Sequence, residues 1–274
     1  MDEIQSTSEI INSFDGEPLY LERYWKGKPT KKLIILHGIC GDTNATVPLI
    51  REILKIDDSI ECITFDLRGH GYSTRKMPDE DNFETVYAKD LIAVVKNEKG
   101  LVSIAGHSYG GFIMQKLLEI EPELPREKLF FISTYNTLPS FSISRHFWFS
   151  RLKKKKNFLI KQKRTPEQHL KHQHSHDFSP WRILADLRFF GFSHYFYLYA
   201  STFGWKSLTP QIINKENVYF FYGDKDLIFS QKIQEKWLKQ LPLVKGKVFH
   251  TNHNILTNLP KELAEALVQV LKED

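Results

Sequence analysis

One serine in this chain has the surroundings of a nucleophile. Gly106-His107-Ser108-Tyr109-Gly110 has the pattern Gly-x-Ser-x-Gly, and it lies directly after a strand-like run and directly before a helix-like run. The glycines leave room for a very sharp turn, which lifts the serine hydroxyl clear of the strand in a strained backbone conformation. A plain glycine-rich turn would require neither the strand before it nor the helix after it. The pattern therefore predicts that Ser108 acts as a nucleophile.

A serine hydroxyl is a weak nucleophile, so it needs a general base, and the base needs an acid that orients it. Tyr222-Gly223-Asp224-Lys225-Asp226 follows a strand-like run late in the chain and offers two carboxylates. This loop lies at the carboxyl end of its strand, where open sheets of parallel strands build their sites. The spacing strand-Gly-x-x-Asp favours Asp226 as the acid, in which case Asp224 is a solvated turn residue.

Two histidines compete for the role of the base. His253 stands in the loop that follows the last strand-like run and precedes a helix that begins near Pro260. His250 stands where that strand should still be running. The loop position favours His253, and it again lies at the carboxyl end of a strand.

Negative charge develops on the carbonyl oxygen of a substrate under attack, and backbone N–H groups can stabilise it. One expected donor is the amide of Tyr109, next to Ser108. The other is the amide of Ile39, in the segment His37-Gly38-Ile39-Cys40-Gly41 that follows the first buried strand-like run. Gly38 lets the backbone approach the substrate. We place His37 beside the substrate and expect it to brace the loop rather than to transfer a proton.

The secondary structure around these residues must bring them together. Strand-like and helix-like runs alternate along most of the chain. The strand-like runs are 9–14, 19–24, 33–36, 60–65, 101–105, 128–133, 218–222 and 247–250, and the helix-like runs are 48–55, 83–96, 110–119, 230–240 and 259–271. Asp15-Gly16 joins the first two strands and is a strong hairpin signal. The alternation predicts an α/β fold in which helices cover both faces of a mostly parallel central sheet. An antiparallel hairpin should form its N-terminal edge.

The alternation stops in the stretch 138–205, which holds twelve lysines and arginines, three acidic residues and a concentration of aromatic residues. We interpret this stretch as an inserted helical lid, and residues 1–137 and 206–274 as the core domain. The lid aromatics are expected both to pack against the core and to line a pocket for an apolar substrate. The candidates for substrate contact, judged from amphipathic spacing, are Phe147, Trp181, Phe189 and Tyr195.

Two further clusters lie in the same stretch. Four consecutive lysines, 153–156, could attract an anionic lipid surface, but a solvated face is favoured because charge runs are usually exposed. Four histidines could bind a metal, but neutral surface side chains are favoured because no His-x-x-x-His pair lies on a clear helix. These histidines are His169, His172, His174 and His176. We therefore expect no metal, no other cofactor and no obligatory membrane partner.

Outside the lid, the motifs together resemble the α/β-hydrolase superfamily. His37-Gly38 resembles the oxyanion loop of that superfamily, and Asp66 to Ser73 resembles the segment after its next strand. Gly106 to Gly110 resembles its nucleophile elbow. Gly223-x-x-Asp226 resembles its acid loop, and His253 with Pro260 resembles its histidine loop. Asn252 departs from the glycine that is common before the histidine. The resemblance implies the chain order serine, acid, histidine. For a short, lidded chain it also implies the esterase and monoacylglycerol-lipase branch.

Composition narrows the remaining function classes. The formal net charge is +5, but the positive charge gathers in one segment without a recognisable nucleic-acid-binding motif. No apolar run approaches the roughly 18 residues of a membrane span. Cys40 and Cys62 are too few for a disulfide framework, and we expect two reduced thiols in or near the core. Residues 1–12 lack the basic start and apolar core of a secretory signal, which favours a cytoplasmic location.

The sequence thus predicts a serine hydrolase that acts on a small-molecule carboxylic ester with a small to medium apolar acyl group, such as a monoacylglycerol. Hydrolysis of a carbon–carbon bond, a thioester or a lactone would use the same triad and stays an alternative. A non-catalytic ligand-binding protein with this fold is a further alternative, against which the complete triad argues. The sequence carries no indication of the oligomeric state.

Overall fold

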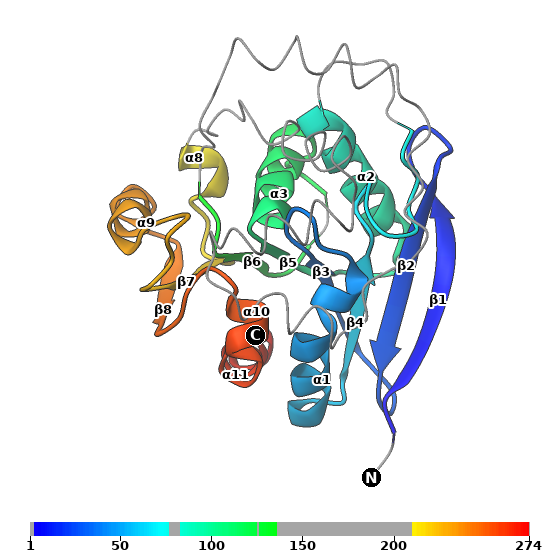
Figure 1. Cartoon of the computed structure of the whole chain (residues 1–274), viewed down its shortest axis with the longest axis horizontal. Coiled ribbons are helices and arrows are strands. Elements are labelled where there is room, and N and C mark those ends of the chain that lie inside the picture. Colours follow the sequence, from blue (N-terminus) through cyan, green and yellow to red (C-terminus); the bar gives the residue numbers. More distant parts are fainter. Residues whose placement is uncertain (1–2, 77–82, 125, 136–209, 274) are drawn as a thin grey trace, which may run out of the picture.

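The computed structural model describes residues 3–76, 83–124, 126–135 and 210–273, and these form one eight-stranded sheet with helices on both faces (Figure 1). The strands are β1 (Gln5–Asn12), β2 (Pro18–Trp25), β3 (Lys31–Leu36), β4 (Ile60–Phe65), β5 (Ser103–His107), β6 (Leu129–Ile132), β7 (Val218–Gly223) and β8 (Lys245–Phe249). Their order across the sheet is β1-β2-β4-β3-β5-β6-β7-β8. The expected lid, with its four aromatic candidates and its lysine and histidine clusters, lies outside the described residues.

The first two strands form the antiparallel hairpin that the Asp15-Gly16 turn predicts. Gly16 has φ +79°, a conformation that glycine adopts without steric cost. β1 pairs with β2, and β2 pairs antiparallel with β4, whereas every later pairing from β4 to β8 is parallel. The expected fold class is therefore confirmed, with the hairpin at one edge of a parallel sheet.

Two hydrophobic cores sandwich the sheet. The helices and short 3-10 turn are η1 (Thr43–Ala45), α1 (Val47–Ile56), α2 (Phe83–Asn97), α3 (Tyr109–Ile120), α8 (Pro210–Ile213), α9 (Gln231–Leu238), α10 (Ile255–Asn258) and α11 (Pro260–Leu271). α1, α10 and α11 bury their apolar residues against one face, and α2, α3 and α9 cover the other (Figure 1). The residues Leu33–Leu36 of β3 are fully buried, as a continuous apolar run in a parallel strand predicts.

The bounds of strand β5, which precedes the nucleophile candidate, differ from those predicted from the sequence. We expected a strand over residues 101–105, but Leu101 is 52% exposed and the strand runs from Ser103 to His107. It continues through Gly106 because both neighbours hold it there, β3 through Leu36 and β6 through Phe131. The serine therefore follows the strand directly. His250 similarly lies one residue beyond β8, which ends at Phe249.

The two cysteines are free and buried, as expected. No helix in the described ranges is long and apolar enough to cross a membrane.

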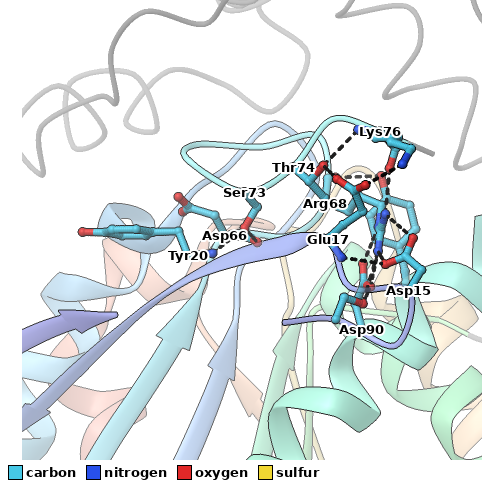
Figure 2. A network of polar contacts seen from close by, with 11 residues as sticks. Asp15, Glu17, Tyr20, Asp66, Arg68, Ser73, Thr74, Lys76 and Asp90 are labelled. Atoms are coloured by element: carbon cyan, nitrogen blue, oxygen red, sulfur yellow. Dashed lines mark hydrogen bonds and ion pairs between the residues drawn. The ribbon is translucent and has the colours of Figure 1, made fainter. Parts of the chain in front are cut away.

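A buried arginine ties the hairpin to the rest of the domain. Arg68, in the loop after β4, is fully buried, and its Nε and Nη2 atoms donate to the two carboxylate oxygens of Asp90 on α2 at 2.9 and 2.8 Å. Its Nη1 and Nη2 atoms donate to Asp15 in the hairpin turn at 3.0 and 2.8 Å. Lys76 adds a carbonyl acceptor at 2.7 Å, and Ser13 a hydroxyl at 3.2 Å. Figure 2 shows how the arginine joins these segments.

The charges in this network depend on one another. Burial is the largest influence on the pKa of Asp15 and raises it, but the hydrogen bonds and charge of Arg68, together with hydrogen bonds from backbone N–H groups, outweigh burial and hold that pKa below its ordinary value. Burial raises the pKa of Asp90, and the hydrogen bonds from Arg68 act in the opposite direction. Removing one partner of a buried ion pair is far more costly than the net gain from the pair, because it leaves a charge without compensation.

We therefore expect Arg68→Met to lower the free energy of unfolding by about 3–5 kcal/mol, measured by urea denaturation. The double variant Arg68→Met/Asp90→Leu should recover a large part of that loss, because it removes the stranded carboxyl as well. The matched control is Lys76→Met, which removes an exposed lysine that pairs with Glu17 at 2.7 Å. Exposed pairs of this kind contribute little, so the control should be nearly as stable as the unsubstituted protein. A loss no larger for Arg68→Met than for Lys76→Met would contradict this account.

Candidate active site

Ser108 occupies a strained turn between β5 and α3. Its φ of 52° and ψ of −111° lie outside the regions that residues with a side chain normally adopt. Two backbone hydrogen bonds hold the turn: the N–H of Ser108 donates to the carbonyl of Ile132 at 2.8 Å, and the N–H of Gly111 donates to the carbonyl of Ser108 at 3.0 Å. The serine is half-buried, so the turn lifts it from the buried sheet toward the surface.

The glycines of the motif are required by close approach. A Cβ at Gly106 would lie 2.6 Å from the backbone carbonyl carbon of Gly110, and a Cβ at Gly110 would lie 2.7 Å from the Cβ of Leu36. Both distances are shorter than real Cβ atoms allow. The turn can therefore form only with glycine on each side of the serine, which is the physical reason behind the sequence pattern.

The structure brings Asp226 and His253 together. His253 Nδ1 lies 2.9 Å from Asp226 Oδ2, and both side chains are almost completely buried. The other carboxylate oxygen, Oδ1, accepts hydrogen bonds from the backbone N–H groups of Ile228 and Phe229, each at 2.8 Å. Because both oxygens of Asp226 act as acceptors, Nδ1 of His253 is the donor. In a neutral ring of this tautomer, Nε2 carries the lone pair that a general base needs.

The competing residues pair with each other on the surface. His250 Nδ1 lies 2.6 Å from Asp224 Oδ2, with the histidine side chain 75% exposed. The hydrogen bond from His250 lowers the pKa of Asp224. We expected Asp224 to be a solvated turn residue, and sequence reasoning did not foresee this second pair. The two pairs come from the same two loops, but only the pair formed by Asp226 and His253 is shielded from water.

The loop that follows β3 reaches the serine. A Cβ at Gly38 would lie 3.3 Å from the Cβ of Ser108, so the loop backbone lies against the nucleophile candidate. Ile39, the next residue, is half-buried and packs against the core. Tyr109 is the first residue of α3 and is 2% exposed. The two expected oxyanion donors thus belong to backbone segments on either side of Ser108.

Two buried histidines brace this loop. His37 Nδ1 donates to the carbonyl of Gly38 at 2.7 Å, and its Nε2 accepts from the N–H of Leu67 at 3.1 Å. His70 Nε2 accepts from the N–H of Cys40 at 3.2 Å, and its Nδ1 faces the carbonyl of Arg68 at 3.1 Å. Both rings are fully buried and use a nitrogen as acceptor, which requires the neutral form. His37 therefore has the position of a bracing residue.

Asp66 supports the same region from the end of β4. Its buried carboxylate accepts hydrogen bonds from the backbone N–H groups of Thr43 and Tyr72, each at 2.8 Å. A Cβ at Gly71 would lie only 2.0 Å from one carboxylate oxygen, so the loop closes tightly over the aspartate. Ser73 donates to the carbonyl of Asp66, and Figure 2 shows this contact beside the Arg68 network. The loops after β3 and β4 are thus joined into one support.

Sequence reasoning missed two residues that contact the histidine. The ring of His107, the residue before Ser108, has its centroid 5.1 Å from that of His253, and its Nε2 lies 2.9 Å from the carbonyl oxygen of His253. On the other side, the Phe229 ring has its centroid 5.6 Å from that of His253. The position of His107 inside the motif was a signal that could have identified it. No local pattern marks Phe229.

No three His, Cys, Asp or Glu side chains gather as metal ligands within the residues that the structure describes. The chemistry that the described arrangement offers is that of acid, base and nucleophile. It combines a strained serine, a buried histidine oriented by a carboxylate, and backbone segments able to stabilise an oxyanion.

Known proteins with this architecture are numerous. The α/β hydrolase fold family model matches residues 31–145. An esterase from Exiguobacterium antarcticum is 19% identical with a TM-score of 0.70, and covers 97% of this chain and 100% of its own. A thermophilic esterase from Thermogutta terrifontis is 17% identical with a TM-score of 0.71, and covers 97% and 98%. The thioesterase domain from the curacin biosynthetic pathway is 12% identical with a TM-score of 0.67, and covers 96% and 99%.

No curated protein sequence matches the chain. The structural likeness lies below 25% identity, so it speaks for the fold alone. Together with the family match over residues 31–145, the eight-stranded sheet with its N-terminal hairpin shows that this chain has the α/β-hydrolase fold.

Proposed function

We propose that this protein is a serine hydrolase that cleaves carboxylic esters through an acyl-enzyme intermediate. The observation that carries the proposal is the buried hydrogen bond between Asp226 and His253. The ring of His253 contacts that of His107, the residue directly before the serine held in a strained turn. Triads of this kind are recognised by geometry and roles, not by sequence position.

In the proposed reaction, Ser108 Oγ attacks the ester carbonyl carbon while His253 Nε2 takes the hydroxyl proton. The carbonyl π electrons move onto the oxygen. The amide of Ile39, in the loop after β3, and the amide of Tyr109, at the start of α3, stabilise this oxyanion. The tetrahedral intermediate collapses, the C–O bond to the alcohol breaks, and His253 returns its proton to the leaving oxygen. Water then attacks the acyl group by the same route and releases the carboxylic acid. Asp226 stays ionised and orients the imidazole throughout.

The acyl group in this proposal is small to medium-sized and apolar, and a monoacylglycerol is one such substrate. The same residues could hydrolyse a thioester, a lactone or a carbon–carbon bond, because each reaction passes through an oxyanion on a carbonyl carbon. A thioesterase domain among the structural neighbours favours thioesters as the second candidate. Comparing a p-nitrophenyl ester with the thioester of the same acyl group would separate the two.

The first test removes the triad residues one at a time. Ser108→Ala should lower kcat for a p-nitrophenyl ester by about 10⁴-fold to 10⁶-fold, because the covalent route is lost. His253→Ala should have an effect of similar size. Asp226→Asn should lower kcat by roughly 10³-fold to 10⁴-fold, because the imidazole is then held in the wrong tautomer. All three variants should keep the circular dichroism spectrum of the folded protein.

The chain supplies a matched control for each position. Ser230→Ala alters an exposed serine, and Asp224→Asn and His250→Ala alter the surface pair. Each control should keep kcat within about threefold of the unsubstituted value, since surface substitutions away from the site have small effects. Greater sensitivity at Asp224 or His250 than at Asp226 or His253 would reverse the assignment of acid and base.

We also propose that residues 138–205 form a lid whose aromatic side chains line the acyl pocket. The support is compositional: aromatic residues concentrate in this stretch, and apolar pockets are commonly lined by them. A methylene group that fits such a pocket contributes about 0.8 kcal/mol. Each carbon added to the acyl chain should then raise kcat/KM by up to roughly fourfold until the pocket is full, after which kcat/KM should fall.

The measurement is kcat/KM over p-nitrophenyl esters from acetate to dodecanoate. Replacing Phe147, Trp181, Phe189 or Tyr195 with alanine should move the optimum more than it changes the rate with acetate. Substituting the four lysines at 153–156 should leave the kinetics with dissolved esters unchanged. A flat profile that none of the four aromatic substitutions alters would assign substrate selection to another part of the chain.

A further inference from the structure

The side chain that precedes the nucleophile candidate contacts two other loops of the site. His107 ends β5 and is 8% exposed. Its Nε2 lies 2.9 Å from the main-chain carbonyl oxygen of His253, across 146 positions of sequence. A carbonyl oxygen can only accept, so Nε2 of His107 carries a proton and donates it. The loop that presents the catalytic base candidate is thus hydrogen-bonded to the residue beside the nucleophile candidate.

The same imidazole also supports the oxyanion loop. A Cβ at Gly38 would lie 3.1 Å from Nδ1 of His107, tighter than ordinary van der Waals contact, so the loop backbone rests against the ring. The ring therefore contacts the elbow, the histidine loop and the oxyanion loop at once.

The catalytic base candidate lies between two rings. The His107 ring is tilted by 48° to that of His253 at 5.1 Å, and the Phe229 ring is tilted by 55° at 5.6 Å. Asp226 fixes Nδ1 of His253, and Phe229 donates its N–H to the other carboxylate oxygen of Asp226. These contacts fix the side chain of His253, but they do not fix the position of its main chain. The hydrogen bond from His107 restrains that position.

We propose that His107 is a positioning residue, which sets the place of His253 relative to Ser108 through a hydrogen bond to the His253 carbonyl. This proposal rests on the proposed function, because it assigns His253 the role of the base. Catalytic groups must be held within about 0.5 Å of the productive geometry, and a shift of about 1 Å can lower the rate roughly a hundredfold. The second position of this Gly-x-Ser-x-Gly motif, directly before the serine, would then require a side chain that can donate a hydrogen bond as far out as a histidine Nε2 does.

Two substitutions of similar size separate the hydrogen bond from the packing. His107→Leu fills the space without a donor, and His107→Gln places an amide N–H near the position of Nε2. With p-nitrophenyl butyrate, His107→Leu should lower kcat about 10-fold to 100-fold while KM changes by less than about twofold. His107→Gln should return kcat to within about threefold of the unsubstituted protein.

The rate of labelling by a fluorophosphonate probe is a second measurement. It should not change if His107 has a purely structural role. For His107→Leu, the rate of labelling should fall in parallel with kcat, whereas the final stoichiometry should remain one probe per chain. The final stoichiometry measures the fraction of chains with a folded site. A slower labelling rate with full final stoichiometry therefore indicates that the base is misplaced in a folded protein. Should His107→Leu fail to fold, His107→Asn tests the same point, because its amide stops short of the His253 carbonyl. It should show the same fall in kcat.

Normal kcat in His107→Leu, or an equal loss in His107→Leu and His107→Gln, would overturn the proposal. Either result would leave the serine hydrolase assignment intact, because the unsubstituted protein would still react with the probe and the ester. Absence of both reactions in the unsubstituted protein would contradict the proposed function, and the role of His107 would be overturned with it.

Discussion

The backbone turn at Ser108 is the constraint on which the rest of the structure depends. A residue held at φ 52° and ψ −111° costs roughly 1–3 kcal/mol and persists only where its surroundings fix it. Here the surroundings are the core itself, because β5 lies between β3 and β6 and the turn donates to the carbonyl of Ile132. The glycines let Leu36 and the first turn of α3 approach without a clash. The position of the serine is thus set by the packing of the central strands.

Buried polar contacts help to hold the loops around this turn. His37 and His70 each accept a backbone N–H, and Asp66 accepts two. These groups satisfy loop N–H groups that have no strand partner at the carboxyl edge of the sheet, where unpaired buried groups would be costly. Arg68 extends the same principle to the hairpin, since it joins Asp15 and Asp90 at 0% exposure. These buried polar groups hold the loops of the site in place, and the pairing of the strands sets the distances between those loops.

Sequence patterns predicted the elements well where burial is continuous. β4 runs from Ile60 to Phe65 as expected, because five of its six residues are buried. β5 was misplaced by two residues, since Gly106 and His107 read as turn residues but are held in the ladder by β3 and β6. The short helix α10 (Ile255–Asn258) has no periodic pattern and was missed. Contacts such as His107 with His253 join residues 146 positions apart, and only the packed fold brings them together. Asp226 and His253 could be proposed because each follows a recognisable strand, whereas the pairing of Asp224 with His250 required the structure.

Mass spectrometry of the protein after reaction with a fluorophosphonate tests the central claim most directly. A serine activated by the buried histidine and carboxylate should form one covalent adduct per chain, and peptide mapping should place it on Ser108. The adduct should not form in Ser108→Ala. An adduct on a different serine, or an unmodified protein after prolonged exposure to the probe, would contradict the claim that the strained turn, the histidine and the aspartate work together as a hydrolytic site.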